Sequence, residues 1–200
     1  MKFEIFKFNS VTSTNDIAIS LIKEKKKESG CIFAEVQTKG RGTHGKRWIS
    51  KKGNFFGSIF FPLKDDYPPF NEFFVVSPII VSEIIEKFCV GKKISFKWPN
   101  DLLINGKKIC GILQEIVTLN KNKFLIIGIG INVISSPDIN IEYKATNILL
   151  ETRKKPNINE IINLIISSYE KFFVNLSSYN FVNFKKKAEI MADNQKTVLL

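Results

Sequence analysis

Two lysines, Lys97 and Lys108, have the residue type and spacing that chemistry on anions requires. Apolar segments flank Asn105 and Gly106, and an Asn-Gly pair between two such segments predicts a two-residue hairpin turn. The segments that carry the two lysines should then lie side by side in one sheet, with both ammonium groups facing one pocket. A pair of fixed cations suits attack by a carboxylate on a nucleotide phosphate, because both reactants are anionic and repel each other.

A glycine-rich basic segment, 37–48, is a second candidate site. It holds three glycines, one histidine and four basic residues between two strand-like runs, 31–36 and 54–61. Glycine lets backbone N–H groups approach an oxyanion and the cations supply charge, so the segment is typical of a mobile anion-binding loop. Such a loop alone would also fit nucleic-acid binding or a plain turn. We expect residues 40–53 to be disordered until a ligand binds.

Two shorter segments complete the set. Segment 128–132 ends an apolar run with two spaced glycines, a pattern that indicates close approach of a ligand ring or a neighbouring helix to a strand. Segment 12–15 is polar and precedes an expected helix, so its plain interpretation is a helix N-cap. Plain interpretations also exist for 98–101, as a turn, and for 128–132, as ordinary packing.

Together, and in this order, the four segments resemble the catalytic domain of biotin protein ligases over nearly the whole chain. The resemblance implies an α/β (α+β) fold, in which helices pack on a mixed, mostly antiparallel sheet like that of class II synthetases. It also implies one catalytic domain at residues 1–195, with 196–200 as the start of a C-terminal β-barrel that is absent or truncated. Many relatives begin with a DNA-binding helix-turn-helix, whereas the first strand is expected here within a few residues of Met1. We therefore expect neither DNA binding nor repression.

The reaction that the resemblance implies has two steps, with ATP and biotin as substrates and Mg²⁺ balancing the polyphosphate. The biotin carboxylate attacks the α-phosphate of ATP and gives biotinyl-adenylate and pyrophosphate. A lysine of the acceptor, expected to be the biotin carboxyl-carrier domain of a biotin-dependent carboxylase, then attacks the mixed anhydride and releases AMP. No enzyme nucleophile is needed, so the protein would act by positioning, charge stabilisation and exclusion of water.

The matched family positions imply roles for individual residues. Lys108 would be the principal catalytic residue, because a compact ammonium can follow charge between the biotin carboxylate and the α-phosphate, and Arg41 would assist it. Asp101 would be the carboxylate nearest Mg²⁺, and Trp48 would close over the nucleotide when the loop orders. The residues expected at biotin are Ser13, Thr14, Asn15, Gln37, Gly40, Arg41, Lys108 and Gly111. The residues expected at the nucleotide are Arg41, Gly42, Thr43, Trp48, Lys97, Asn100, Asp101 and Asn132.

One position departs from the family pattern. Many relatives carry a second arginine where this chain has Thr43. Because a cation beside the adenylate is lost, we expect the intermediate to escape more readily than in an arginine-bearing relative. His44 is the only histidine, and neither reaction step needs it, so we interpret it as a loop residue without a catalytic role.

Composition agrees with one catalytic domain. Two hundred residues at 44% hydrophobic content can bury a single sizeable core, and no apolar run reaches the roughly 18 to 20 residues of a membrane span. The net charge of +11 comes from lysines scattered along the chain, which favours a solvated surface, although a basic rim could attract an acidic carrier domain. Three widely spaced cysteines argue against a disulfide framework and a zinc site. We expect a soluble, cytoplasmic protein, and leave a homodimer paired through a sheet edge open.

Two alternative functions remain open from the sequence. A lipoate or octanoyl ligase or transferase would share this fold class, and in an octanoyl transferase Cys110, two residues from Lys108, would carry the acyl group. A basic nucleic-acid-binding protein without catalysis would show salt-sensitive binding that does not depend on ATP.

Residue patterns also predict the elements that must position these groups. Expected strands are 2–8, 31–37, 54–61, 94–98, 101–104, 108–118 and 124–133. Expected helices are 15–26, 71–88, 159–176 and 180–192. Segment 71–88 is apolar almost all round, which indicates a helix buried against the sheet.

Overall fold

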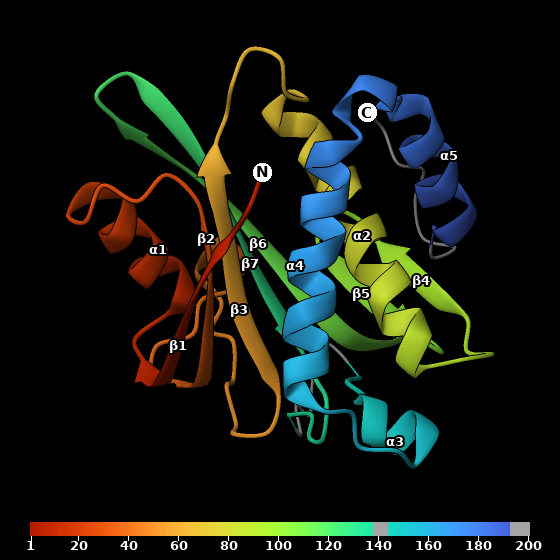
Figure 1. Cartoon of the computed structure of the whole chain (residues 1–200). Helices are drawn as coiled ribbons and strands as arrows, with labels where there is room; N and C mark the ends of the chain where they lie inside the picture. The colour runs from red at the N-terminus through yellow and green to blue at the C-terminus, as the bar shows by residue number, and fades with distance from the viewer. Residues whose placement is uncertain (138–143, 193–200) are drawn as a thin grey trace.

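One mixed sheet organises the molecule. The computed structural model describes residues 1–137 and 144–192, and in these ranges seven strands form a sheet in the order β1-β2-β3-β7-β6-β5-β4 (Figure 1). The strands are β1 Glu4–Val11, β2 Gly30–Gln37, β3 Phe55–Pro62, β4 Ile94–Lys97, β5 Asp101–Ile104, β6 Lys107–Leu119 and β7 Asn122–Ile131. β1 and β2 run parallel, whereas the other neighbouring pairs are antiparallel. The mixed, mostly antiparallel sheet predicted from the sequence is confirmed.

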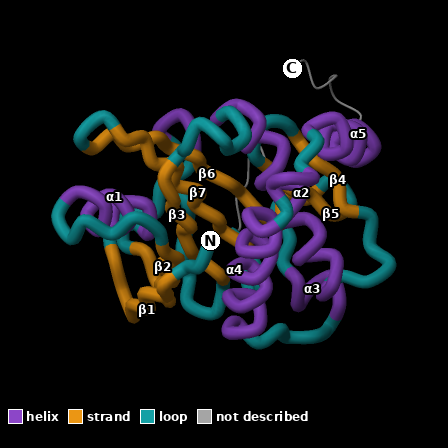
Figure 2. The backbone as a smooth tube through the Cα atoms, turned by 45° about the horizontal axis from the view of Figure 1, so that its top comes forward, coloured by secondary structure: helices purple, strands orange, loops and turns teal. Residues whose placement is uncertain are grey.

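Helices cover the two faces of this sheet unequally (Figure 2). α1 contacts β2, β3, β6 and β7 from one face, whereas α2 and α4 pack on the other and α5 packs against α2 and β4. The helices are α1 Thr14–Lys23, α2 Phe73–Phe88, α3 Ile148–Thr152, α4 Ile158–Val174 and α5 Phe181–Met191. The predicted helices therefore exist with ends shifted by a few residues. The short α3 was not predicted, because five residues are too few to show a helical period.

Strand alternation divides the apolar side chains between two cores. On β7, Leu125, Ile127 and Ile129 join the large cluster under α2 and α4, whereas Phe124 and Ile126 face α1. Each fully buried side chain of this size contributes roughly 1.5–3 kcal/mol. The expected burial of α2 is confirmed, because it lies between the sheet and the helices α4 and α5. The faces differ in bulk: among the described helices, α2, α4 and α5 cover one side, whereas α1 alone covers the other and leaves room there.

The described helices and the cysteines test two expectations drawn from the composition, which concerned membrane spans and disulfides. None of the helices in the described ranges is long and apolar enough to cross a bilayer. The three cysteines are buried free thiols. The predicted boundary at residue 195 and the predicted barrel strand at 196–200 lie outside the described residues.

Candidate active site

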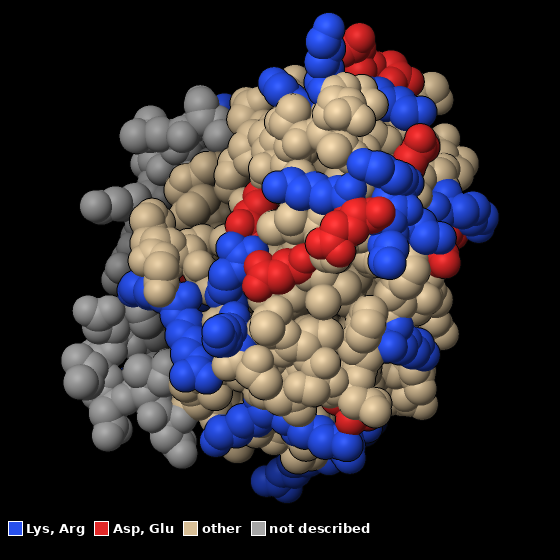
Figure 3. All heavy atoms as spheres, turned by 90° about the vertical axis from the view of Figure 1, so that its left-hand side faces the viewer, with Lys and Arg blue, Asp and Glu red and all other residues tan. Residues whose placement is uncertain are grey.

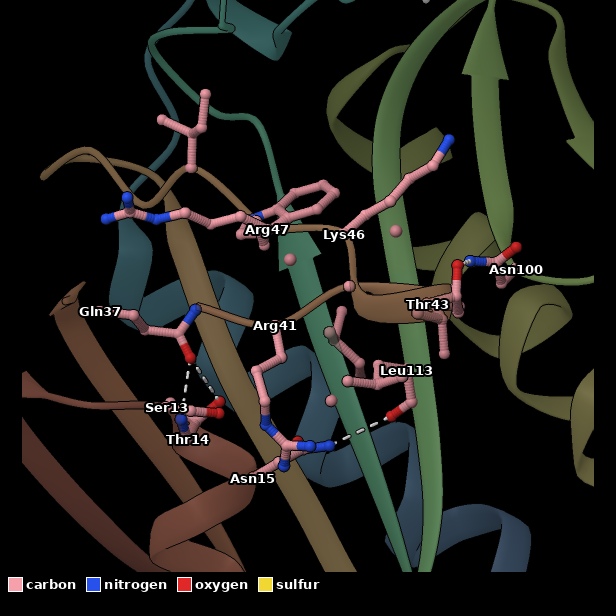
Figure 4. A pocket seen from close by; sticks show the side chains of 18 of the residues that line it. Ser13, Thr14, Asn15, Gln37, Arg41, Thr43, Lys46, Arg47, Asn100 and Leu113 are labelled. Atoms are coloured by element: carbon pink, nitrogen blue, oxygen red, sulfur yellow. Dashed lines mark hydrogen bonds between the residues drawn. The ribbon is translucent and has the colours of Figure 1, made fainter. Parts of the chain in front are cut away.

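A cavity opens on the α1 face of the sheet, beyond the first turn of α1, and the loop between β2 and β3 covers it (Figure 4). The loop is folded as a small hairpin, in which Arg41 pairs with Arg47 and the Trp48 amide donates to the Gly40 carbonyl at 2.9 Å. Segments 13–15, 108–113 and 128–132 all reach this cavity. The four segments singled out in the sequence therefore meet at one place.

Glycines make the floor of the cavity. Along the α1 face of β7, Phe124 and Ile126 pack under α1 and are followed by Gly128 and Gly130, so the bulk stops where the cavity begins. A Cβ on Gly128 would collide with the side chain of Asn15, and one on Gly130 with the indole of Trp48. The expectation of close approach at these glycines is confirmed, by α1 at the first and by the loop at the second.

A polar cluster lines the end of the cavity at the start of α1 (Figure 4). Ser13 occupies the N-cap position, but its side chain does not cap the helix. Instead, Gln37 of β2 accepts from the Thr14 amide at 2.8 Å with Oε1, which satisfies one N–H that a helix start leaves without a partner. The Ser58 hydroxyl, from β3, lies 2.7 Å from Thr14 Oγ1 and 2.5 Å from Asn15 Oδ1. This interlocked cluster can hydrogen-bond a neutral polar group such as a cyclic urea.

Lys108 reaches the cavity because of a bulge. Leu102 pairs with Cys110 and Leu103 with Lys108, so Ile109 is an extra residue on β6. In a strand without this bulge, regular alternation over residues 108 to 110 would point Lys108 to the same face as Cys110, into the core. Its Nζ lies 2.7 Å from Asp101 Oδ1 and 5.2 Å from the centre of the Trp48 ring. The ammonium is therefore held beside the glycine floor by a carboxylate and an aromatic face.

Arg41 extends from the covering loop toward the first turn of α1 (Figure 4). Its Nη1 and Nη2 donate to the two oxygens of Glu115 at 2.7 Å each, and Nη2 lies 2.8 Å from Asp16 Oδ1. Burial lowers the pKa of the guanidinium, but Glu115 and Asp16 outweigh burial, and the pKa of Arg41 is raised above its ordinary value. The side chain is therefore a permanent cation fixed between two carboxylates.

Charge on the cavity wall has one sign. Among the described residues that line it, four are cationic, Arg41, Lys46, Arg47 and Lys108, and none is Asp or Glu. Fixed cations in a partly enclosed site attract anions and stabilise negative charge as it develops. The arrangement suits a ligand with a neutral polar end and an anionic end.

Most of the expected site residues meet here, with three exceptions. Gly40, Lys97 and Asp101 do not line the cavity, although Asp101 contacts Lys108. The residues that do line it are Ser13, Thr14, Asn15, Gln37, Arg41, Gly42, Thr43, Trp48, Asn100, Lys108, Gly111 and Asn132.

The predicted hairpin at Asn105 and Gly106 is confirmed, since both have positive φ, 51° and 70°. It joins β5 to β6, so the expectation that the Lys97 and Lys108 segments are neighbours is wrong, because β5 lies between them. Lys97 pairs with Asp101, and Asp101 with Gly111. Lys97 thus lies on the cavity face two strands away from Gly111, at roughly 10 Å.

Sequence reasoning missed several contributors. Glu115, Asp16 and Ser58 were not singled out, because each meets its partners only through contacts between distant segments. Asn54 was also missed; its Oδ1 accepts from the amides of Val133 and Ile134, and so fixes the turn that follows β7. An isolated polar residue next to a strand carries no signal for such a role.

Two asparagines connect the cavity to its surroundings. The side chain of Asn132 donates through Nδ2 to the Thr146 carbonyl at 3.0 Å, and so holds the segment that begins at residue 144 beside β6. Asn100 donates to Thr43 Oγ1 at 3.3 Å, so it ties the covering loop to the β4–β5 connection (Figure 4).

Cys110 does not reach the cavity. Its side chain belongs to the core cluster on the opposite face of the sheet, and burial raises the pKa of its thiol. A buried thiol with a raised pKa is a poor nucleophile. The geometry therefore argues against an acyl transferase that uses this cysteine.

Comparison with known proteins agrees with this geometry. The family model of the biotin/lipoate A/B protein ligase family matches residues 7–132, and the chain belongs to that family. The bifunctional ligase/repressor BirA of Bacillus subtilis is 32% identical over 181 residues, which cover 88% of this chain and 55% of BirA.

Solved structures are similar over nearly the whole chain. The biotin protein ligase of Aquifex aeolicus, in complex with biotin and ATP, is 30% identical, with a TM-score of 0.78 over 94% of this chain and 78% of that one. The ligase of Leishmania major, in complex with biotinyl-5-AMP, is 25% identical, with a TM-score of 0.80 over 98% of this chain and 84% of that one. The resemblance stated from the sequence is confirmed. The chain spans about half the length of BirA, 55%.

Proposed function

We propose that this chain carries out the ATP-dependent ligation of biotin to a lysine of a carrier domain, through biotinyl-adenylate. The observation that supports this best is the cavity wall, with its polar cluster at one end and with Lys108 but no carboxylate among the described lining residues. The related ligases of known structure hold biotin with ATP, or biotinyl-5-AMP. A neutral ureido ring and a carboxylate at the two ends of one molecule match such a wall.

The cavity suggests how biotin lies. The polar cluster of Ser13, Thr14 and Gln37 would bind the ureido ring, and the apolar part of the cavity wall would take the aliphatic chain. The biotin carboxylate would then point to the ammonium of Lys108. This ammonium is held in place by Asp101, whose Oδ1 lies 2.7 Å from Lys108 Nζ. The carboxylate oxygen attacks the α-phosphorus, pyrophosphate leaves, and the ammonium stabilises charge on both groups.

The nucleotide would occupy the other end of the cavity. Thr43 and Asn100 lie there, joined by a hydrogen bond, and Lys97 lies on the same face. Trp48 would shield the adenylate from water, because its indole covers the floor at Gly111 and Gly130. In the second step the amine of the acceptor lysine attacks the carbonyl carbon, and AMP leaves.

Mg²⁺ would enter with ATP as part of the substrate. No group of three or more His, Cys, Asp or Glu that could hold a metal occurs in the described part of the chain. Asp101 can offer one carboxylate, but its Oδ1 faces the Lys108 ammonium. We propose that phosphate oxygens supply most of the ligands and that Asp101 adds at most one, which fits the preference of Mg²⁺ for phosphates and few carboxylates.

The acceptor would be a biotin carboxyl-carrier domain. The loop between β2 and β3, which covers the cavity, carries the exposed basic residues Lys39, Lys46, Arg47, Lys51 and Lys52. They could speed encounter with an acidic carrier. Elsewhere the charges are mixed: Figure 3 shows Lys and Arg spread over the face that includes α1 and β1, with Asp and Glu between them. Mixed charge on that face supports a solvated surface there. The free thiols support a reducing compartment such as the cytoplasm.

The test is pyrophosphate release from ATP with biotin, lipoate or octanoate supplied in turn. We expect release with biotin and a loss of about 10²- to 10³-fold in Lys108→Ala, the range seen when one stabilising group is removed. Lys107→Ala is the matched control, because Lys107 is adjacent but does not line the cavity. Release with lipoate instead would reassign the substrate, and release with none of the three acids would refute the proposal.

A further inference from the structure

Glu115, a carboxylate on β6, contacts both the covering loop and α1 and so joins them to the sheet. It follows Gly111 and Leu113 on the cavity face of β6, just beyond the lining residues. Its Oε1 accepts from Arg41 of the loop at 2.7 Å. Its Oε2 accepts from Arg41 and from Asn15 Nδ2 of α1, also at 2.7 Å each. Both oxygens therefore accept hydrogen bonds, from Arg41 of the covering loop and from Asn15 of α1.

The first contact closes the loop. A bidentate Arg–carboxylate pair is among the strongest and most directional polar contacts in proteins. Asp16 adds a third contact at 2.8 Å to Arg41 Nη2. These three contacts use three of the five donors of the guanidinium and place two negative charges against its one positive charge. Arg41 is thereby engaged as a clasp, and little of its charge remains for a substrate.

The second contact fixes the orientation of an amide. A carboxylate only accepts hydrogen bonds, so Asn15 must turn its Nδ2 toward Glu115. Its Oδ1 then faces the Ser58 hydroxyl at 2.5 Å, and that hydroxyl lies 2.7 Å from Thr14 Oγ1. The Asn15 amide packs directly against Gly128, since even a Cβ there would collide with it. Asn15 Nδ2 also donates to the Leu113 carbonyl at 3.4 Å, so Glu115, with the shorter contact, sets together with that carbonyl the direction of a hydrogen-bond chain that ends in the polar cluster.

We propose that Glu115 is a positioning residue, which holds the loop closed through Arg41 and orients the polar cluster through Asn15. The proposal rests on the proposed function, since a closed loop and an oriented cluster matter for binding biotin and retaining its adenylate. It assigns Arg41 to the clasp of the loop.

Glu115→Gln keeps the shape of the side chain but removes its charge and replaces one of its two acceptor oxygens with an N–H₂ donor, so the bidentate contact with Arg41 cannot be kept. We expect the KM for biotin to rise about tenfold or more in biotin-dependent ATP–pyrophosphate exchange, with kcat changed less than threefold. In a Trp98→Phe background, Trp48 is the single tryptophan, and its emission should shift to the red as the loop opens. Protease cleavage within 40–53 should become faster.

Three further variants separate the contacts. Asp16→Asn weakens only the clasp, so cleavage should rise while the KM for biotin changes less than threefold. Glu115→Asp keeps the charge but is shorter, so it should restore part of the loss in Glu115→Gln. Glu83→Gln removes a carboxylate from a remote ion pair with Lys187, also 2.7 Å long, and should leave exchange unchanged.

The outcomes are distinct. A wild-type KM for biotin and wild-type Trp48 emission in Glu115→Gln would overturn the proposal. It would also be overturned if Glu115→Gln and Glu115→Asp raised the KM equally and the increase only tracked the drop in melting temperature. If Glu115→Gln does not fold, Asp16→Asn decides, and unchanged cleavage there would overturn the clasp. Absence of biotin-dependent exchange in the wild type would refute the proposed function instead, while emission and proteolysis would still test the clasp.

Discussion

Gly130→Ala is the substitution with the most specific expected effect on the cavity. Gly130 lies on the floor, and the atoms nearest to an added Cβ all belong to the indole of Trp48, with Cζ2 and Nε1 at 2.6 Å. Carbon contacts are favourable at about 3.5–4.0 Å, so the ring must retreat by roughly 1 Å. No backbone atom is among these nearest neighbours, so the loop side chain can move while the sheet stays in place.

The displacement sets the expected magnitude. A misplacement of about 1 Å near reacting groups can cost about 10²-fold in rate. We expect kcat/KM for biotin-dependent pyrophosphate exchange to fall about 10- to 100-fold, because the indole also faces the Lys108 ammonium at 5.2 Å. The free energy of unfolding should change by less than about 1 kcal/mol, in the range of substitutions that leave the core intact.

Gly57→Ala is the matched control, since the same change on β3 points to the opposite face of the sheet. Its Cβ would meet Phe55 Cζ at 2.6 Å and the Ile32 carbonyl oxygen at 3.0 Å, and backbone cannot retreat. Overpacking of this kind costs about 1–3 kcal/mol, so stability should fall while the folded protein keeps its kinetics. Exchange kinetics and thermal unfolding of both variants check the reasoning. Wild-type kcat/KM in Gly130→Ala, or equal stability losses in both variants, would refute it.

Three further predictions concern single side chains in the cavity, in the core and at the surface. Thr43→Arg should slow adenylate dissociation severalfold, because it adds a cation to the lining; equal off-rates for wild type and variant in a filter-binding assay would contradict this. Cys110→Ala should retain biotin transfer and lose about 1–2 kcal/mol of stability as a buried small side chain shrinks, and loss of all transfer would revive a thiol-based transferase. The Lys2 ammonium holds the pKa of Glu170 below its ordinary value, so this pair adds stability above the unfolded pKa that is lost as pH falls through the folded one. Urea unfolding at pH 7 and pH 3 should show that Glu170→Gln removes less than about 1 kcal/mol at the higher pH only, as for an exposed pair.

Local patterns in the sequence determined several parts of the fold. Asn105 and Gly106 specify a turn in which both residues have positive φ, because few other residue pairs tolerate that backbone. Apolar residues lie almost all round a helix over 71–88, which indicates a buried helix, and within α2 only Glu83, Glu86 and Lys87 are exposed. Gly128 and Gly130 indicate close approach without naming what approaches. In each case the structure is determined by interactions within a few residues, or by the periodic spacing of apolar residues along one helix or strand.

Only the tertiary structure decided which side chains meet at the site. One extra residue, Ile109, reverses the alternation of β6 and turns Lys108 from the core to the cavity, and no local pattern marks that bulge. Glu115, Arg41 and Asp16 come together because β6, the covering loop and α1 converge on one face of the sheet. In the sequence these three residues are far apart, and a glutamate, an arginine or an aspartate by itself does not indicate a site. Their meeting depends on strand order and register, which follow from packing of the whole sheet and not from any one segment.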